Sequence, residues 1–501
     1  MTLAVIDSTS GRDAADRWKQ RTIAQSGCAA KTQNRSFDAA GRLATQSGLG
    51  LSSAGSYSYD ANSGLKSYDY LPLALGGTLA SSYTYYPGGA LATSTTNGID
   101  GSFTFDEVGN LVTDTESDTG TTVFTCDPAN RLTQTELDGG DGGAIVTTYY
   151  GWDASNAWRT CQGPVPSPTP ANEPIVFTYT AQGRLATYAN ADTATSAVYT
   201  YDGSGQRTKS EVTVAGTTTT TLFAYEGLTL MSLSATQGAT SWRVDYLCDE
   251  EGTPFGGVYR SPATSTTPKY FTLVTNDRGD ALELCDADGA AFAAYRYDAW
   301  GLPQGAGSYA TGVWTQSTSL VTSTLAGQIA SRQVLRYAGY AWDAESALYY
   351  CSARSYDPAT RQWTSGDPAK ADGEESAYQY CGGDPVGMVD IAGDYPGPSH
   401  WPRATLREKA LNFAKLRIGR PKSIVYNWSH IDCDAWCVLA VSFFYDRVGS
   451  YAFNRDKLER LSVLWGGAGG GGGPERRGMD HRETDVRRLR RHQDTQVQTD
   501  S

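Results

Sequence analysis

Hydrophobic and polar positions recur in a fixed order from about residue 35. The order is an aromatic residue, one other residue, a second aromatic, an acid, a short turn with glycine, and then leucine. A spacing of roughly 20 to 27 residues is typical of repeat architectures. The clearest copies lie at Phe37–Leu43, Tyr57–Leu65, Phe103–Leu111, Phe124–Leu132, Phe177–Leu185 and Tyr199–Gly205.

Each copy predicts a β-hairpin. Residues i and i+2 of a strand point to the same face, so the two aromatics share one side of the sheet. Asp and Gly suit the turn, and Leu begins the returning strand on that side. We therefore expect a mainly β fold in which the tyrosines stack in a core and have no chemical role.

Three stretches interrupt this pattern. Residues 161–174 contain five prolines, and proline cannot donate to a strand ladder, so we expect an extended insertion. Residues 262–268 and 304–334 are rich in Ser, Thr and Gly and are predicted to be loops.

The pattern changes to a helical period after Asp394. Apolar residues at 406, 410, 413, 414 and 418 form one helical face that ends at Gly419. A second, buried helix is predicted from Trp436 to Tyr445, with Asp434 as its N-cap. Cys437 then lies in the first helical turn, where the helix dipole favours a thiolate.

Composition narrows the possible functions. The chain has 501 residues, 55 Gly, 31 Tyr and a formal charge of −13, which argues against a nucleic-acid-binding surface across the whole chain. Any such role must be local, and no nucleic-acid partner is expected. Nine scattered cysteines do not form a disulfide framework. No signal peptide or membrane-spanning stretch is visible, so we expect synthesis in the cytoplasm and export by dedicated machinery.

Two aspartates frame a junction at residues 337–394. Asp367 opens the segment DPAKA, Asp390 opens DIAGD, and eighteen residues separate these segments. Two neighbouring carboxylates suit peptide hydrolysis, because one keeps a proton as general acid while the other activates water. The same residues are also ordinary turn formers, so the spacing by itself leaves a structural interpretation open.

The junction resembles the RHS-repeat-associated core of bacterial polymorphic toxins and insecticidal toxin complexes. The matching segments are Arg354–Pro358, Asp367–Pro368 and Asp384–Asp390. The resemblance implies that Asp367 and Asp390 form a self-cleaving protease that cuts at Asp394-Tyr395. This copy departs from the two DPxGL motifs of that family at Lys370, Ala371, Ile391 and Asp394.

The hairpin motif resembles the YD repeat of RHS proteins and teneurins over residues 35–394. The resemblance implies a spiral β-sheet shell that encloses a cavity. This stretch is short for such a shell, which leaves three alternatives: a partial shell, a shell completed by a second protein, or a fragment.

Residues 395–465 resemble the start of a papain-like hydrolase of the NlpC and CHAP type. The resemblance rests on the interval from Cys437 to Gly449 and on Trp436. It implies Cys437 as nucleophile, and a peptide bond of peptidoglycan or an amide of a target protein as substrate. Only His481 and His492 follow as candidate bases. Two other interpretations stay open: Cys437 as a core residue, and metal binding by His430, Cys433 and Cys437.

The sequence thus predicts five regions: 1–34, a β shell at 35–336, the core at 337–394, a truncated effector domain at 395–465, and a Gly- and Arg-rich disordered tail at 466–501, which a shifted reading frame would also explain. We expect an RHS-type toxin without cofactors or metals, with catalytic candidates Asp367, Asp390, Cys437 and His481. Expected partners are a second shell protein, the export machinery and an immunity protein. The competing hypothesis is a non-enzymatic YD-repeat surface or cell-contact protein.

Overall fold

The computed structural model describes residues 3–6, 19–25, 31–40, 42–48, 55–60, 65–70, 79–139, 144–155, 157–248, 252–276, 278–304, 312–367, 376–393 and 397–398. By its internal contacts the chain divides into two units, Met1–Phe413 and Ala414–Ser501. All of the described residues belong to the first unit, and the architecture below is that of this unit alone.

The main element among the described residues is a 26-stranded antiparallel sheet. Each strand pairs with the next along the chain, from β1 with β2 to β25 with β26. The strands are β1 Leu3–Ile6, β2 Gln20–Gln25, β3 Lys31–Phe37, β4 Leu43–Gly48, β5 Gly55–Tyr59, β6 Leu65–Tyr70, β7 Leu79–Tyr85, β8 Leu91–Thr96, β9 Ile99–Phe105, β10 Leu111–Glu116, β11 Gly120–Cys126, β12 Leu132–Asp138, β13 Val146–Trp152, β14 Arg159–Gly163, β15 Ile175–Tyr179, β16 Leu185–Asn190, β17 Thr195–Tyr201, β18 Arg207–Val214, β19 Thr217–Glu226, β20 Thr229–Gln237, β21 Thr240–Cys248, β22 Pro254–Arg260, β23 Lys269–Thr275, β24 Ala281–Cys285, β25 Ala291–Tyr295 and β26 Val313–Thr315. The prediction of a mainly β fold is confirmed.

The repeat motif forms the hairpin turns. Between β9 and β10, Asp106 Oδ1 accepts hydrogen bonds from the backbone N–H groups of Val108 and Asn110, at 3.1 and 2.8 Å. Gly109 has a φ of +86°, a conformation that costs glycine little. Asn130 takes the same conformation in the next copy, where glycine is absent. The leucines that follow these turns are buried at Leu43, Leu91, Leu111, Leu132 and Leu185.

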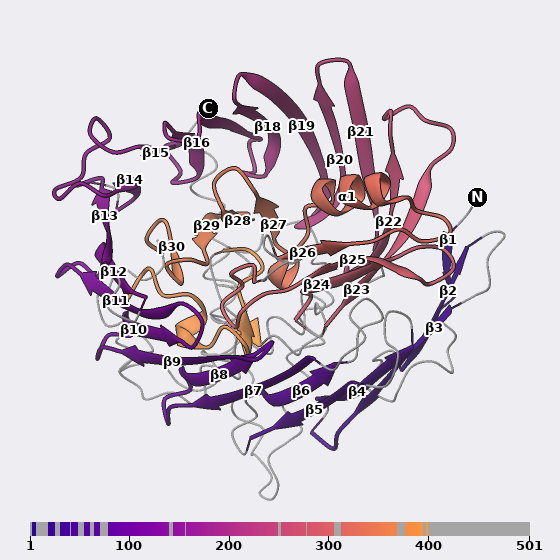
Figure 1. Ribbon diagram of the computed structural model, residues 1–501, viewed down its shortest axis with the longest axis horizontal. Coiled ribbons are helices and arrows are strands. Elements are labelled where there is room, and N and C mark those ends of the chain that lie inside the picture. The colour runs from indigo at the N-terminus through magenta and orange to yellow at the C-terminus, as the bar shows by residue number, and fades with distance from the viewer. Residues whose placement is uncertain are drawn as a thin grey trace, which may run out of the picture. The chain divides into compact units, whose positions relative to one another are not determined.

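The sheet bends around the described residues of 337–393, which follow β26 (Figure 1). These residues are called the inner segment. This inner segment contains a four-stranded sheet of β27 Ala341–Asp343, β28 Leu348–Cys351, β29 Arg354–Asp357 and β30 Gln362–Trp363. Single turns of 3₁₀-helix lie at Tyr337–Gly339 and Cys381–Gly383, and β31 (Met388–Val389) pairs with β32 (Gly397–Pro398).

Three buried arginines tie the inner segment to the sheet. Arg159 at the start of β14 pairs with Asp357, and Arg207 at the start of β18 pairs with Asp343, both with N–O distances of 2.6 Å. In the reverse direction, Arg361 of the inner segment pairs with Asp114 of β10 at 2.8 Å and with Asp298 and Glu116. All of these ion pairs except Arg361–Asp298 join residues more than a hundred positions apart in the sequence.

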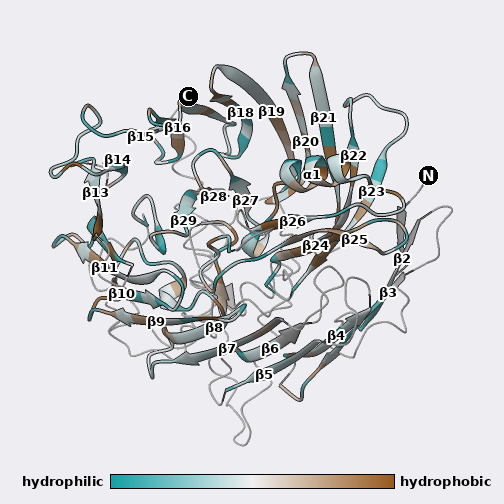
Figure 2. Ribbon diagram, in the orientation of Figure 1, coloured by the Kyte–Doolittle hydropathy of each residue, from teal (hydrophilic) through white to brown (hydrophobic). Residues whose placement is uncertain are grey.

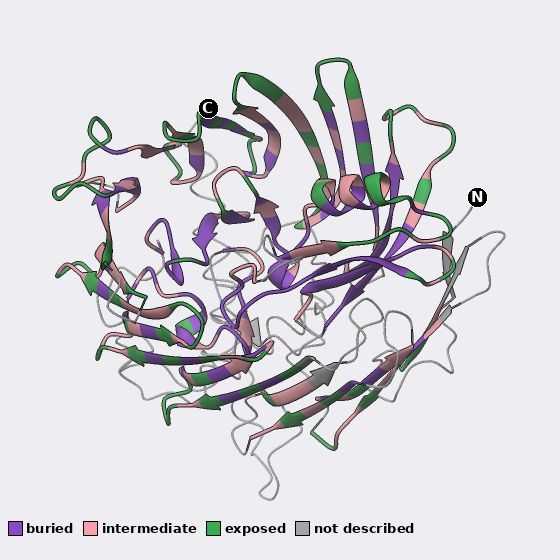
Figure 3. Cartoon of the chain, in the orientation of Figure 1, coloured by how far each residue is buried: buried purple, intermediate pink, exposed green. Residues whose placement is uncertain are grey.

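Strands β22 to β25 are buried along nearly their whole length (Figure 3). Figure 2 shows hydrophobic residues concentrated on β24 and β25. A strand covered on both faces needs apolar residues at successive positions, so it reads as a continuous apolar run. The helix α1 (Ser323–Arg332) contributes to this cover by packing on β25 and β26.

The structure corrects two of the predicted loops. Residues 304–334 include β26 and α1, because Thr322 caps the helix and Ala326, Ile329 and Ala330 form its buried face. The Ser- and Thr-rich composition concealed that face. In the proline-rich stretch, residues 161–163 belong to β14, and irregular backbone starts only at Pro164. Residues 262–268 are irregular, as predicted.

Candidate functional site at the junction

The inner sheet and the turn after β31 place the two predicted aspartates. Asp367 follows β30, and its backbone N–H donates to the carbonyl of Ala377 at 2.9 Å. Asp390 directly follows β31, and its backbone N–H donates to the hydroxyl of Tyr340 at 3.0 Å. Both side chains are buried, with exposed fractions of 7% and 1% for the two residues.

Arg354 at the start of β29 brings these aspartates together. Its Nη2 atom lies 3.3 Å from Asp367 Oδ2 and 3.3 Å from Asp390 Oδ2. The guanidinium carbon is 4.2 Å from the centre of the Trp363 ring, which covers one side of the cation. A cation between two buried carboxylates offsets their mutual repulsion, so both can lie near one point inside the protein.

The turn from Asp390 to Gly393 is held by the same residues. Asp390 Oδ1 accepts a 2.8 Å hydrogen bond from the Gly393 N–H, and the Arg354 Nε–H donates to the Gly393 carbonyl. Gly393 has a φ of +73°, and a Cβ atom there would lie 2.4 Å from the carbonyl oxygen of Cys351. Glycine is therefore required, and the last described residue before the predicted scissile bond is bonded to both Arg354 and Asp390.

Tyrosine and cysteine side chains surround this turn. Tyr340 donates from its hydroxyl to the Asp390 carbonyl at 2.8 Å, and its hydroxyl lies 3.0 Å from that of Tyr380. Burial, followed by the negative charge of Asp390, raises the pKa of the Cys351 and Cys381 thiols well above their ordinary value. These cysteines are therefore protonated at neutral pH and unsuited to nucleophilic attack.

A small pocket that is partly open to solvent lies beside the turn. Tyr340, Cys351 and Ile391 line it from the inner segment, and Tyr225 and Leu230 line it from the sheet. Tyr340, whose hydroxyl bonds to the Asp390 backbone, and Ile391, the residue after Asp390, are both part of its lining.

The other predicted site residues lie outside the described residues. The catalytic candidates Cys437 and His481 are among them. So are the alternative site residues His430, Cys433 and His492, the cleavage site Asp394-Tyr395, and the motif departures Lys370 and Ala371. In the described part of the chain no cluster of His, Cys, Asp or Glu could hold a metal ion. No helix among these residues is long and apolar enough to cross a membrane.

Sequence analysis gave Arg354 no role, although it opens one of the motifs that carried the resemblance. An arginine in a predicted strand is usually assumed to face solvent, because charged residues are seldom fully buried without a partner. The number of acids in the junction could have indicated a role for Arg354, because buried acids need a cation nearby.

Comparison with known proteins gives relatives by sequence and by fold. No family model matches the chain. It is 31% identical over 232 residues to the tRNA3(Ser)-specific nuclease WapA of Bacillus spizizenii, covering 45% of this chain and 8% of that protein. It is 26% identical over 346 residues to the double-stranded DNA deaminase toxin A of Burkholderia cenocepacia, covering 58% of this chain and 22% of that protein.

Among solved structures, a crystal structure of TcdB2-TccC3-Cdc42 has a TM-score of 0.55 and 16% identity, and the match covers 78% of this chain and 20% of that one. The RHS-repeat shell predicted from the YD motif is thus supported in fold, and one of the two sequence relatives is named as a toxin. The names of the sequence relatives conflict with the prediction of no nucleic-acid partner. That prediction rested on the charge of the whole chain, which cannot describe a short effector segment.

Proposed function

We propose that this chain is the shell and self-cleaving junction of an RHS-type polymorphic toxin, and that Asp367 and Asp390 cut it at Asp394-Tyr395. The observation that supports this most is the convergence of both aspartates on Arg354, next to the bound Gly393 carbonyl. The similarity to the double-stranded DNA deaminase toxin A and the fold shared with the TcdB2-TccC3-Cdc42 structure agree with it.

The reaction would be hydrolysis of one peptide bond. A water molecule attacks the carbonyl carbon of Asp394 and gives a proton to one aspartate of the pair. The other aspartate donates a proton to the amide nitrogen of Tyr395 as the C–N bond breaks. The products are a new carboxylate at Asp394 and a new amine at Tyr395. Arg354 offsets the negative charge that the pair carries during these proton transfers.

Apparent masses of the full chain after expression test this proposal. We expect two fragments from the wild type and a single band from Asp367→Asn and from Asp390→Asn. Asp343→Asn is a matched control, because Asp343 is a buried junction aspartate paired with a different arginine, Arg207. A single band for the wild type, unchanged in all variants, would show that the junction does not cut itself.

The released segment is proposed to be the effector. The first candidate chemistry is a cysteine peptidase or amidase in which Cys437 attacks an amide carbonyl and His481 is the base that the chain offers. Fast alkylation of Cys437 at neutral pH in the full chain, compared with a Cys437→Ser variant, would support a reactive nucleophile. Alkylation no faster than that of Cys433 would assign Cys437 to a core.

A second candidate chemistry is action on nucleic acid, which the names of the nuclease and deaminase relatives favour. Incubation of the cleaved protein with peptidoglycan, transfer RNA and double-stranded DNA separates the candidates by product. Because the chain spans less than a quarter of either relative, similarity alone does not select the substrate.

The shell is proposed to be completed by a second protein. Among the described residues, β1 pairs only with β2 and β26 only with β25, so the ordered sheet has two end strands. The solved structure of similar fold, TcdB2-TccC3-Cdc42, combines more than one named component, which fits this arrangement. Export by dedicated machinery and neutralisation by an immunity protein belong to the same proposal. Should no cleavage and no effector activity be found, a YD-repeat contact protein would be the better description.

A further inference from the structure

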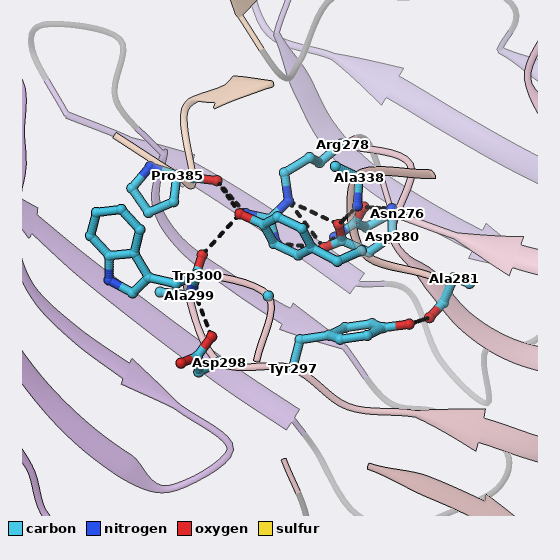
Figure 4. Close-up of polar contacts among 12 residues, drawn as sticks. Asn276, Arg278, Asp280, Ala281, Tyr297, Asp298, Ala299, Trp300, Ala338 and Pro385 are labelled. Atoms are coloured by element: carbon cyan, nitrogen blue, oxygen red, sulfur yellow. Dashed lines mark hydrogen bonds and ion pairs between the residues drawn. The ribbon is translucent and has the colours of Figure 1, made fainter. Parts of the chain in front are cut away.

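The hairpin turn between β23 and β24 contacts both ends of the inner segment (Figure 4). Arg278 donates from Nη1 to the carbonyl of Pro385 at 2.7 Å and from Nε to both carboxylate oxygens of Asp280 at 2.9 and 3.1 Å. Asp280 Oδ1 in turn accepts from the backbone N–H of Ala338 at 2.7 Å. One arginine–aspartate pair therefore holds the inner segment at residue 338 and again at residue 385.

Tyr337 supports the same carbonyl from the opposite end of the inner segment. Its hydroxyl lies 2.9 Å from the carbonyl oxygen of Pro385 and 3.2 Å from that of Ala299. The ring is fully buried, and the Arg278 guanidinium lies 4.3 Å from its centre. Two buried donors thus converge on the Pro385 carbonyl.

A short connection joins this carbonyl to the cleavage site. After Pro385 the chain turns tightly, with the Gly387 N–H donating to Asp384 Oδ1 at 2.6 Å and the Met388 N–H donating to the Asp384 carbonyl at 3.2 Å. Strand β31 follows at once and ends beside Asp390. Because the chain between Pro385 and Asp390 is a tight turn followed directly by β31, a displacement of Pro385 also displaces Asp390.

We infer that Arg278 and Tyr337 are positioning residues for the proposed self-cleavage, and that they place Asp390 against Arg354 and Asp367 by holding the Pro385 carbonyl. This inference rests on the proposed function. Neither residue contacts the two aspartates; Arg278 comes from the repeat shell, far upstream of the junction. On this inference the shell takes part in self-cleavage, because Arg278, one of the two donors to the Pro385 carbonyl, lies in the turn between β23 and β24.

Two conservative variants test the inference without removing a buried charge. Tyr337→Phe keeps the ring and removes the hydroxyl. Arg278→Lys keeps the charge, but one ammonium group cannot bind Asp280 through two donors and reach Pro385 as well. Matched controls are Tyr295→Phe, whose buried hydroxyl donates to the Ala330 carbonyl of α1, and Arg207→Lys, which weakens the buried pair with Asp343.

The measurement is the rate at which the C-terminal fragment appears after synthesis of the full chain in a cell-free translation system, at several pH values. Misplacement of a reacting group by about 1 Å can cost roughly 100-fold in rate. We expect a loss of roughly threefold to tenfold in Tyr337→Phe and about tenfold or more in Arg278→Lys, with the midpoints of the pH profile unchanged. The controls are expected to cut within about twofold of the wild-type rate, even where their Tm falls equally.

The outcomes separate this inference from the proposed function. Wild-type cleavage with equal rates in Tyr337→Phe and Tyr295→Phe overturns the positioning role and leaves self-cleavage intact. If fragment release slows in all four variants in proportion to their loss of Tm, Arg278 and Tyr337 contribute to stability alone. Absence of cleavage in the wild type overturns both proposals. If Arg278→Lys does not fold, Tyr337→Phe decides the question.

Discussion

Tyr201 donates a hydrogen bond from its hydroxyl to the backbone carbonyl of Leu185, at 2.6 Å, and so joins one YD repeat to the preceding one. Tyr59 makes the same bond to Leu43 at 2.8 Å, and Tyr85 makes it to Leu65 at 2.7 Å. Trp152 uses its indole N–H in the same way toward Leu132. The second aromatic of the motif therefore contributes more than the expected stacking, because its polar end links successive hairpins.

Removing these hydroxyls is expected to weaken the sheet one repeat at a time. Each of Tyr59→Phe, Tyr85→Phe and Tyr201→Phe should lower the free energy of unfolding by about 1 kcal/mol, the usual net value of such a bond. Tyr201 lies in β17, ten or more strands along the sheet from β5 and β7, so its loss should add to those of Tyr59 and Tyr85 in the triple variant. Thermal melting followed by circular dichroism measures this, and an unchanged Tm in the triple variant would contradict it.

The buried pair of Arg207 and Asp343 predicts a large loss when only one partner is removed. The guanidinium binds both carboxylate oxygens at 2.6 and 2.8 Å, and both residues are buried. Arg207→Met leaves Asp343 buried without its cation and should cost about 3–5 kcal/mol. The double variant Arg207→Met with Asp343→Leu should recover most of that loss in chemical denaturation. A double variant as unstable as the single one would show that packing, and not the unpaired charge, causes the loss.

Gly393 and Gly382 form a matched pair for testing the turn at the cleavage site. Both have positive φ, but a Cβ atom at Gly393 would meet the Cys351 carbonyl at 2.4 Å, whereas at Gly382 it would meet nothing within 4 Å. Gly393→Ala should therefore displace the turn and slow fragment release by roughly tenfold or more. Gly382→Ala should cost about 1 kcal/mol of stability and leave cleavage intact. Equal cleavage in the two variants would contradict the importance of this turn.

Glu345 predicts a pH dependence of stability. Burial, followed by the negative charge of Asp343, raises its pKa from 4.5 to about 7, while the hydrogen bond from Tyr199 and the charge of Arg207 act in the opposite direction. Between pH 4.5 and 7 the folded chain then holds more protons at this site than the unfolded chain. Its contribution to stability is therefore complete at low pH and is lost as pH rises through this range.

Glu345→Gln should remove that part of the pH dependence. The variant should be more stable than the wild type at pH 8, by on the order of 1 kcal/mol, and the difference should disappear near pH 4.5. Burial also raises the pKa of Glu116 to about 8 and that of Asp384 to about 6. Their contributions to stability therefore fall with rising pH as well, and they do so in both the wild type and the variant. The test is therefore the difference between Tm curves from pH 4.5 to 8, and parallel curves would contradict the assignment.

The sequence by itself determined the hairpins, because each is closed by contacts within a few residues. Asp106 binds the backbone of Val108 and Asn110, Gly109 supplies the positive φ, and Leu111 is buried on the aromatic side. Such local chemistry recurs wherever the motif does, so each of the six clearest copies predicted a hairpin that the structure contains, whereas the full set of strands came from the structure. Asp367 and Asp390, which the resemblance of the junction singled out, both lie 3.3 Å from Arg354 Nη2, and their catalytic role stays a prediction.

Only the tertiary structure decided what neutralises and positions these acids. Arg159 meets Asp357, Arg207 meets Asp343 and Arg361 meets Asp114 across 136 to 247 residues of sequence. No local pattern marks such partners, because a buried charge pairs with the opposite charge that lies nearest to it in the folded protein. The curvature of the whole sheet sets the distance between the two charged groups. The hold of Arg278 on Pro385 was concealed in a similar way, because it joins residues 107 positions apart, whereas α1 was concealed by its Ser- and Thr-rich composition. The hairpins form through contacts within each repeat, whereas the site depends on where the inner segment lies relative to the sheet.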